Sequence, residues 1–278
     1  MKKLCCLIAV AVFVFTLSGG CFAVENEPQV SAKAAVVIEA GTGRVVFGKN
    51  ENAKLPMAST TKIMSVLLTL ESGDLDSEFV VDSEAVKTEG SSMGLMEGDI
   101  VSKRDLCIGM LLPSGNDAAN CAAVKVGGSM AGFADMMNAK ASRLGLKNTH
   151  FTNASGLYDP NHYSTATDIA MLMSAVMEND TCREILGTYQ YTTTATEQHP
   201  EGILLESTMY SRMYGNEVTG ISIDAGKTGY TDEAGNCLVS YATDTEGKHF
   251  IAVTAKGPTY WRAVFDTFAI YGLIHNGY

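Results

Sequence analysis

The chain has 278 residues, which is enough for one large domain or two small ones. Hydrophobic residues make up 46 % of it, the proportion of a globular protein with a sizeable core. Acidic residues outnumber basic ones by 31 to 20, and the net charge of −11 argues against nonspecific binding to nucleic acid, because phosphates repel such a surface.

The segment 1–23 has the layout of a secretory signal peptide. Lys2 and Lys3 form a basic start, an unbroken apolar run follows at 4–17, and Cys21-Phe22-Ala23 ends in a small residue. The run is short for a membrane-spanning helix. We therefore expect an exported protein of the cell envelope or medium. A lipoprotein cleaved before Cys21 is the alternative, and membrane attachment would require that the signal segment be retained.

Four cysteines and five histidines remain after this segment. The cysteines lack Cys-x-x-Cys spacing, and a domain of this size does not need disulfide bonds, so we expect buried free thiols. The histidines show neither His-x-x-x-His spacing nor clustering with cysteine, so we predict no metal site. These residues are Cys107, Cys121, Cys182 and Cys237, and His150, His162, His199, His249 and His275.

The mature chain begins with strand-like segments and then a helix. Residues 34–50 are typical of two short strands around a Gly-Thr-Gly turn. After Ser59, apolar residues recur at helical spacing, and Pro56 and Gly73 lie just outside the two ends. Ser59 is therefore predicted at or near the N-terminus of a helix.

The remaining pattern changes from helices to strands. Helices are predicted over 105–123 (broken by a turn), 129–145 and 165–179, strands over 220–231, 236–244 and 249–257, and a closing helix over 260–274. This order predicts an α+β fold: a central antiparallel sheet of N- and C-terminal strands flanked by helices, with an inserted mostly helical subdomain. No linker-like stretch appears, so residues 24–278 are expected to form a single domain.

The segment Ser59-Thr60-Thr61-Lys62 is the first of three candidate motifs. On a helix, residues three apart share a face with Cβ atoms about 5–6 Å apart, so the Ser59 hydroxyl can give its proton to the Lys62 amine. The lysine must then be neutral, which requires burial or a neighbouring cation. By itself the spacing is weak evidence, because a capping serine followed by an unrelated surface lysine has the same pattern.

The other two motifs are Ser114-Gly115-Asn116 in a predicted turn and Lys227-Thr228-Gly229 on a predicted strand. Taken singly, each fits an ordinary turn or a solvent-facing strand lysine. Gly226-Lys227-Thr228 also resembles the end of a phosphate-binding loop, but that loop needs glycine where Ile221 stands. We therefore predict no nucleotide and no other cofactor.

The three motifs in this order, Ser-x-x-Lys, Ser-x-Asn and Lys-Thr-Gly, are typical of serine enzymes that act on D-alanyl peptides and β-lactams. The sequence resembles the low-molecular-mass penicillin-binding proteins, or serine-type D-alanyl-D-alanine carboxypeptidases. The likeness runs from about residue 34 to 254 and is carried by four blocks: "LPMASTTKIMSVLLTLE", "EGSSMGLMEGDIVSKRDLCIGMLLPSGNDAAN", "HFTNASGLYDPNHYSTATDIAMLM" and "GKTGYTDEAGNCLVSYA".

The resemblance implies a role for each motif residue. Ser59 is similar to the nucleophile that attacks the penultimate D-alanine, Lys62 to its general base, and Ser114 to the relay that protonates the leaving amine. Asn116 would orient the substrate amide. The partners implied are a peptidoglycan stem peptide ending in D-Ala-D-Ala and β-lactam antibiotics as inhibitors, with no nucleic acid.

The third motif would form the wall of the substrate site. The resemblance implies that Lys227 and Thr228 receive the terminal carboxylate and that Gly229 lets the substrate backbone lie against the strand. The backbone N–H groups of Ser59 and Tyr230 would form the oxyanion hole. Arg212, which precedes this motif in the chain, is a further candidate for the carboxylate.

Three alternatives stay open at this point. A β-lactamase of the same fold commonly carries a Glu-x-x-Leu-Asn segment, which does not occur between Ser114 and Lys227. A binding module without turnover would keep the same residues. Endopeptidase or transpeptidase activity would use the same acyl-enzyme. Many family members also carry a β-rich domain and a C-terminal membrane anchor, neither of which is expected here; residues 260–274 are expected to pack on the sheet instead.

Overall fold

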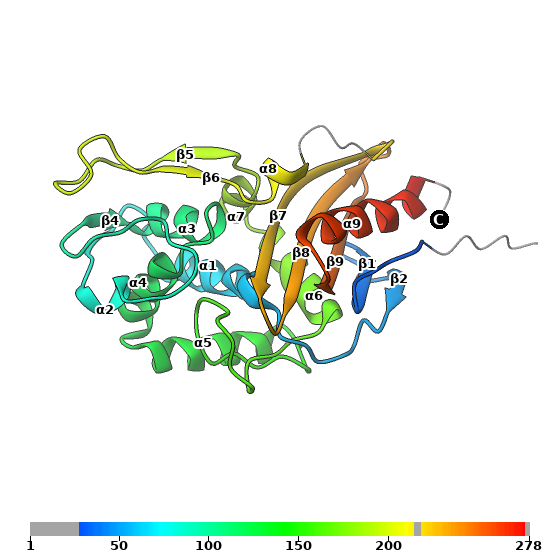
Figure 1. The fold of residues 1–278 in the computed structure, drawn as a ribbon, viewed down its shortest axis with the longest axis horizontal. Helices are drawn as coiled ribbons and strands as arrows, with labels where there is room; N and C mark the ends of the chain where they lie inside the picture. The colour runs from blue at the N-terminus through cyan, green and yellow to red at the C-terminus, as the bar shows by residue number, and fades with distance from the viewer. Residues whose placement is uncertain (1–27, 214–217, 276–278) are drawn as a thin grey trace, which may run out of the picture.

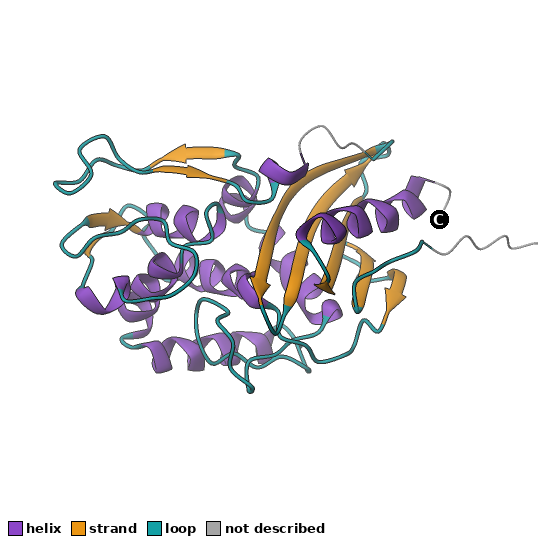
Figure 2. Cartoon of the chain, viewed as in Figure 1, coloured by secondary structure: helices purple, strands orange, loops and turns teal. Residues whose placement is uncertain are grey.

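The computed structural model describes residues 28–213 and 218–275, so the predicted signal peptide over residues 1–23 lies outside them. A five-stranded antiparallel sheet stands beside a large helical part, as Figures 1 and 2 show. The α+β prediction is confirmed, including the insertion of the helical part between the N- and C-terminal strands.

The central sheet has the strand order β2-β1-β9-β8-β7. Its strands are β1 (Ala34–Glu39), β2 (Val45–Lys49), β7 (Ile221–Thr231), β8 (Gly235–Asp244) and β9 (His249–Gly257). The N-terminal hairpin joins the C-terminal strands through the β1–β9 pair, in which Val36 lies opposite Val253. β7 is the last strand in this order, so one of its edges has no neighbouring strand, and this edge faces the helical part.

The helical part follows β2 and returns to the sheet at β7. Its helices are the 3₁₀ helix η1 (Ala58–Thr61), α1 (Lys62–Glu71), α2 (Ser83–Val86), α3 (Lys103–Leu111), α4 (Asn116–Gly127), α5 (Met130–Arg143), α6 (Ala166–Met177), α7 (Asp180–Leu186) and α8 (Tyr210–Met213). It also carries two small two-stranded antiparallel sheets: β3 (Glu78–Val80) with β4 (Ile100–Ser102), and β5 (Gln190–Thr192) with β6 (Leu204–Glu206). These short, largely exposed strands have too few residues to show a period, and the sequence did not predict them.

Hydrophobic residues on the two faces of the sheet form separate cores. The larger core lies between the sheet and the helical part, and α1 runs through it with every residue from Lys62 to Thr69 buried. The smaller core lies under α9 (Tyr260–His275), which covers the opposite face as predicted for residues 260–274. Because α1 is buried on all sides over this range, apolar residues occur around the whole helix and are not confined to one face.

Two further observations concern the cysteines and the membrane. Cys107, Cys121, Cys182 and Cys237 are all buried and free, as predicted. Within the ranges 28–213 and 218–275, no helix combines the length and apolar character needed to span a bilayer.

Helix α9 also holds the start of the described chain. The buried carboxylate of Asp266 accepts hydrogen bonds from the backbone N–H of Ser31 (3.0 Å), the Ser31 hydroxyl (2.8 Å) and the backbone N–H of Ala32 (2.7 Å). The segment entering β1 is therefore fixed to the helix that closes the fold.

We predict that Asp266→Ala lowers the free energy of unfolding by about 2–4 kcal/mol, because it removes a buried acceptor of three hydrogen bonds and leaves the buried N–H of Ala32 without a partner. Urea denaturation followed by circular dichroism measures this change. Asp135→Ala, on the exposed face of α5, is the control and should change the value by less than about 0.5 kcal/mol. Equal losses in the two variants would contradict the assigned role of Asp266.

Candidate active site

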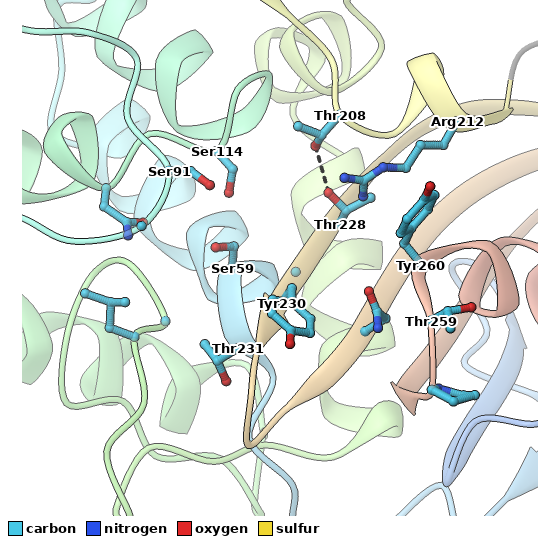
Figure 3. Close-up of a pocket in the computed structure, with 17 residues that line it drawn as sticks. Ser59, Ser91, Ser114, Thr208, Arg212, Thr228, Tyr230, Thr231, Thr259 and Tyr260 are labelled. Atoms are coloured by element: carbon cyan, nitrogen blue, oxygen red, sulfur yellow. Dashed lines mark hydrogen bonds between the residues drawn. The ribbon is translucent and has the colours of Figure 1, made fainter.

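A cleft of about 720 Å³ opens between the free edge of β7 and the helical part. Six of the eight residues predicted from the motifs line it: Ser59, Ser114, Asn116, Thr228, Gly229 and Tyr230. The other two, Lys62 and Lys227, are buried behind its wall. The structure thus brings together three motifs that lie far apart in the sequence. Figure 3 shows Ser59 in the middle of this cleft, with Ser114 on the helical side and Thr228 on the strand side.

The amine of Lys62 lies at the base of the cleft with three oxygen partners. It donates to Asn116 Oδ1 at 2.6 Å and to the main-chain oxygen of Ser155 at 2.8 Å, and it lies 2.9 Å from Ser59 Oγ. The first two oxygens can only accept, so they take two N–H bonds. A neutral amine then keeps its lone pair for the proton of the Ser59 hydroxyl.

The surroundings of Lys62 favour this neutral state. The side chain is completely buried, and burial is the main cause that lowers its pKa well below the usual lysine value. The buried Lys227 lowers the pKa further by repulsion, whereas Asp117 acts in the opposite direction. These causes act in the direction that the sequence required, toward an uncharged base beside Ser59.

Asn116 is held in one orientation by the loop that opens the second block of the resemblance, although no residue of this loop was assigned a role from the sequence. Its Nδ2 donates to the main-chain oxygen of Glu89 at 2.7 Å, so Oδ1 is the atom that faces Lys62. Gly90 allows this approach: its φ is +81°, and a Cβ there would lie 2.9 Å from Asn116 Nδ2. The amide predicted to orient substrate thus also binds the general-base candidate.

Ser114 lies in the turn between α3 and α4 with an unusual backbone conformation. Its φ is +69°, and that of Ala58, next to Ser59, is +47°. Side-chain-bearing residues rarely adopt these angles, and such strain concentrates at functional sites. Figure 3 shows the hydroxyls of Ser114 and Ser91 directed into the cleft opposite Ser59. Ser91 was not identified from the sequence, since a lone loop serine carries no signal.

Asp117, directly after the second motif, organises the loop that carries Ser91. Its buried carboxylate accepts from the Ser92 hydroxyl (2.5 Å) and from the backbone N–H groups of Met93 (2.9 Å), Gly94 (3.1 Å) and Leu95 (3.0 Å). One side chain at the start of α4 therefore sets the shape of the upper wall of the cleft.

Two basic side chains, Lys227 and Arg212, lie toward the strand side of the cleft. Lys227 is buried, and its amine donates to the main-chain oxygen of Thr228 at 2.7 Å. Burial is the main cause that lowers the pKa of Lys227 to about 7, and repulsion by Arg212 adds to it. Arg212 lines the cleft with its guanidinium 5.0 Å from the ring centre of Tyr260. These two groups make the strand side of the cleft basic, although the chain as a whole has a net charge of −11.

Gly229 is required for a reason that the sequence analysis did not foresee. A Cβ at this position would lie 2.8 Å from the backbone nitrogen of Ser59 and 3.1 Å from the oxygen of Met57. The absent side chain therefore lets β7 pack directly on η1, which places the backbone of Ser59 beside the strand. Tyr230 follows at once, so two residues predicted to supply oxyanion donors line the same cleft.

The loop from Asn153 to Leu157 supplies the third partner of Lys62. Asn153 fixes this loop by accepting from the backbone N–H of Gly156 at 2.8 Å and donating to the oxygen of Leu157 at 2.9 Å. Ser65 on α1 donates to the oxygen of Ala154 at 2.6 Å. This loop lies in the third block of the resemblance, but the sequence could not show that the main-chain oxygen of Ser155 accepts from Lys62, because every residue has such an oxygen.

His162 locks the same loop region to the helix that carries the nucleophile candidate. Its Nδ1 accepts from the backbone N–H of Thr152 at 3.1 Å, so the proton lies on Nε2, which donates to the Thr61 hydroxyl at 2.8 Å. Burial lowers the pKa of His162 to about 4, and the ring is neutral at physiological pH.

No metal centre accompanies these residues in the part of the chain that the structure describes, where no three His, Cys, Asp or Glu side chains gather to hold an ion. The chemistry available to the cleft is that of a hydroxyl beside a buried amine whose pKa is lowered, with the basic side chains of Lys227 and Arg212 nearby. Such an arrangement can perform acyl transfer on a substrate that carries an anionic end.

Comparison with known proteins identifies related chains. Residues 22–259 match the family model described as D-alanyl-D-alanine carboxypeptidase. The chain is 34 % identical over 255 residues to D-alanyl-D-alanine carboxypeptidase DacF of Bacillus subtilis; the match covers 87 % of this chain and 63 % of that protein, less than two thirds of its length. DacB2 of Mycobacterium tuberculosis is 33 % identical over 241 residues, with 84 % of this chain and 80 % of that protein covered.

Solved structures agree with these relatives. The Streptomyces K15 DD-transpeptidase superposes with a TM-score of 0.80 at 29 % identity, over 89 % of this chain and 98 % of that one. A D-alanyl-D-alanine carboxypeptidase from Mycobacterium tuberculosis superposes with the same TM-score of 0.80 at 29 % identity, over 90 % of this chain and 92 % of that one.

We predict that the buried, neutral His162 makes the fold less stable in acid. Between the ordinary histidine pKa of about 6.5 and the folded-state pKa of about 4, the unfolded chain binds a proton that the folded chain does not. Stability is therefore complete above about pH 6.5 and falls as the pH drops, by about 2–3 kcal/mol at about pH 4.5. Urea denaturation at both pH values measures the loss.

His162→Gln is the matched variant, because Gln keeps a donor for Thr61 but does not titrate. Its stability should change less between neutral and acidic pH than that of the parent chain, by about 2–3 kcal/mol. Parallel pH profiles for the two proteins would disprove the contribution of His162.

Proposed function

The chain belongs to the D-alanyl-D-alanine carboxypeptidase family, and we propose that it removes the terminal D-alanine from peptidoglycan stem peptides through an acyl-enzyme on Ser59. The observation that carries this proposal is the position of the buried Lys62 amine, 2.9 Å from Ser59 Oγ and bonded on its other sides to two acceptor oxygens. That arrangement suits a base that takes one proton from one hydroxyl.

In the first step, the Ser59 oxygen attacks the carbonyl carbon of the penultimate D-alanine while its proton passes to Lys62. Charge develops on the carbonyl oxygen, and the backbone N–H groups of Ser59 and Tyr230 stabilise it. Donors of this kind contribute about 3–4 kcal/mol each in related acyl transfer. The close packing of Gly229 on the Ser59 nitrogen supports this pairing.

In the second step, the tetrahedral intermediate collapses and the bond to the terminal D-alanine breaks. The leaving amine needs a proton, and Ser114 relays it from the Lys62 ammonium; the direction of its hydroxyl into the cleft supports this role. A water molecule then attacks the ester carbonyl and gives a proton to Lys62, which passes it to the Ser59 oxygen as the ester bond breaks, so that the hydroxyl and the neutral amine are restored. Asn116 holds Lys62 and the substrate amide in register.

The substrate carboxylate is placed by the strand side of the cleft. Lys227 and Thr228 receive it, and Arg212 contributes charge from the rim. The hydrogen bond of 2.7 Å between the Thr228 and Thr208 hydroxyls fixes the Thr228 side chain for this contact. An anionic chain end meets a positive region there, which excludes substrates that end in a neutral or basic group.

The same site carries two extensions of the proposal. β-Lactams have a carboxylate and a reactive amide at similar positions, so they acylate Ser59 and inhibit the enzyme. Other acyl acceptors or leaving groups are compatible with the cleft, since relatives include a protein named D-alanyl-D-alanine endopeptidase, from Pseudomonas aeruginosa, besides the Streptomyces transpeptidase. We further propose that residues 24–278 act as one catalytic unit outside the cytoplasm, after removal of the predicted signal peptide.

We predict that Ser59→Ala abolishes both covalent labelling by a fluorescent penicillin and release of D-alanine from diacetyl-lysyl-D-alanyl-D-alanine. Lys62→Met, which removes the amine but fills its volume, should slow labelling at least about 100-fold, the range for loss of a general base. Gel fluorescence and a D-alanine assay measure these rates.

Lys54→Met, a change at an exposed lysine, is the control and should label like the parent. Full labelling of Ser59→Ala would refute the nucleophile assignment, and normal labelling of Lys62→Met would assign the base to another group. Rapid repeated hydrolysis of nitrocefin by the parent would indicate a β-lactamase instead.

The pKa of Lys227, about 7, predicts how substrate binding depends on pH. Below this value the amine is charged and binds the substrate carboxylate; above it the charge is lost, so KM should rise with pH. Arg212→Gln removes a cation that lowers the pKa of Lys227, so the rise in KM should move to higher pH even though overall binding weakens.

Steady-state D-alanine release across the pH range measures both profiles. Arg143→Gln, at an exposed position on α5, should leave the profile in place. A rise that moves to lower pH in Arg212→Gln would contradict the proposed electrostatic coupling.

A further inference from the structure

Three aromatic rings are exposed together at the start of α9. The exposed fractions of Tyr260, Trp261 and Phe265 are 43 %, 42 % and 49 %. The ring centres of Tyr260 and Trp261 are 5.0 Å apart, and those of Trp261 and Phe265 are 6.3 Å apart with only 24° between the ring planes. We call these three residues the aromatic surface of α9.

The fold does not account for this exposure. The inner side of the helix already fills the second core, with Ala263, Val264, Ile270 and Tyr271 buried. The Tyr271 hydroxyl is anchored as well, donating to the main-chain oxygen of Ser240 at 2.9 Å. The aromatic surface points away from these contacts, and clustered exposed rings of this kind mark binding surfaces.

The aromatic surface is continuous with the catalytic cleft. Tyr260 and the preceding Thr259 line the cleft, and Figure 3 shows the Tyr260 ring beside Arg212 at its rim. Trp261 and Phe265 extend the same row of rings outward along α9. A molecule that enters the cleft with a bulky polymer attached therefore meets these rings as it leaves the cleft.

We propose that the aromatic surface of α9 binds the saccharide chain of peptidoglycan. This inference rests on the proposed function, which supplies a peptide carried on a polymer of amino sugars. Pyranose rings present faces of C–H groups that pack on aromatic rings, and their hydroxyl and acetamido groups need polar partners. Arg262, exposed between Trp261 and Phe265, offers such donors.

Charge favours a neutral saccharide over a lipid surface as the occupant. Arg262 is the only lysine or arginine between residues 260 and 275, and the whole chain has a net charge of −11. Peripheral helices that bind anionic bilayers instead carry several basic residues on the polar face. A second copy of the chain would bring two molecules of net charge −11 together, which also opposes pairing.

The test uses the intrinsic fluorescence of Trp261, the single tryptophan of the chain. The full chain carrying Ser59→Ala is titrated with the tetramer of β-1,4-linked N-acetylglucosamine. We expect a saturable change in emission, and Phe265→Ala should weaken the association about five- to tenfold, the effect of losing one aromatic partner. Leu204→Ala, which removes a side chain that is 58 % exposed on β6, is the control and should bind like the parent.

Further measurements test binding to the natural polymer and the two alternative occupants, a lipid surface and a second copy of the chain. Co-sedimentation with purified, insoluble peptidoglycan should fall by a similar factor in Trp261→Ala and Phe265→Ala, whereas Leu204→Ala sediments like the parent. The proposal is overturned if the tetramer leaves the emission unchanged, or if phosphatidylglycerol vesicles shift it while the saccharide does not. Self-association through this face, detected by sedimentation velocity and lost in Phe265→Ala, would also overturn it.

Failure of this inference and failure of the proposed function are distinguishable. The binding assays use Ser59→Ala and need no turnover, whereas release of D-alanine from the small peptide by the parent chain needs no saccharide. Saccharide binding without D-alanine release would support the proposed role of the aromatic surface and contradict the proposed enzyme activity. D-alanine release without saccharide binding would support the enzyme activity and contradict the role of the surface.

Discussion

The buried amine of Lys62 is the interaction on which the other parts of the site depend. An ammonium ion without counter-charge in a protein interior costs several kcal/mol, whereas a neutral amine with satisfied N–H bonds does not. The fold supplies Asn116 Oδ1 and the Ser155 carbonyl as the two acceptors. Each acceptor comes from a different segment of the helical part. The position of the amine therefore depends on how these segments pack around α1.

The site lies at the contact between the sheet and the helical part because each side contributes what the other lacks. The helical part carries the hydroxyl, the amine and their partners. The free edge of β7 adds Thr228, the Lys227 cation and the backbone that faces a bound peptide. Gly229 permits this contact, because a Cβ there would lie 2.8 Å from the Ser59 nitrogen; within the helical part, Gly156 similarly allows its loop to approach η1, where a Cβ would lie 2.0 Å from the Ala58 oxygen. Close approach of main chain to main chain is therefore part of how the nucleophile candidate is held.

The inside of the cleft and the surface around it differ in charge. Burial lowers the pKa values of both Lys62 and Lys227; repulsion by Lys227 adds to the effect on Lys62, and repulsion by Arg212 adds to the effect on Lys227. Outside, the protein is acidic, and the exposed aromatic rings of α9 lie where the cleft reaches the surface. A polymeric substrate with an anionic peptide end and neutral sugars matches both parts. The aromatic rings extend recognition beyond the few atoms that react.

Local sequence determined much of this protein. Strand alternation, helical spacing and turn residues predicted the sheet, the main helices and the α+β class, because each depends on neighbouring residues. The Ser59–Lys62 pair was also predictable, since a spacing of three on a helix brings two side chains together wherever the helix lies. The two small sheets and the short helices α2, α7 and α8 were missed because such brief segments show little or no period.

Only the tertiary structure decided the rest. Burial of Lys62 and Lys227 depends on segments distant in the sequence, so neither pKa could be argued from composition. The Ser155 carbonyl carries no residue identity that a motif can show, and the need for Gly229 arises from its packing on Ser59 rather than from the substrate alone. Arg212 and Tyr260 meet at the rim although three strands of the sheet lie between them in the chain. The sequence by itself determined which groups were available and the local geometry of one pair; long-range packing decided which of them meet, because contacts between distant segments form only when the whole core is assembled.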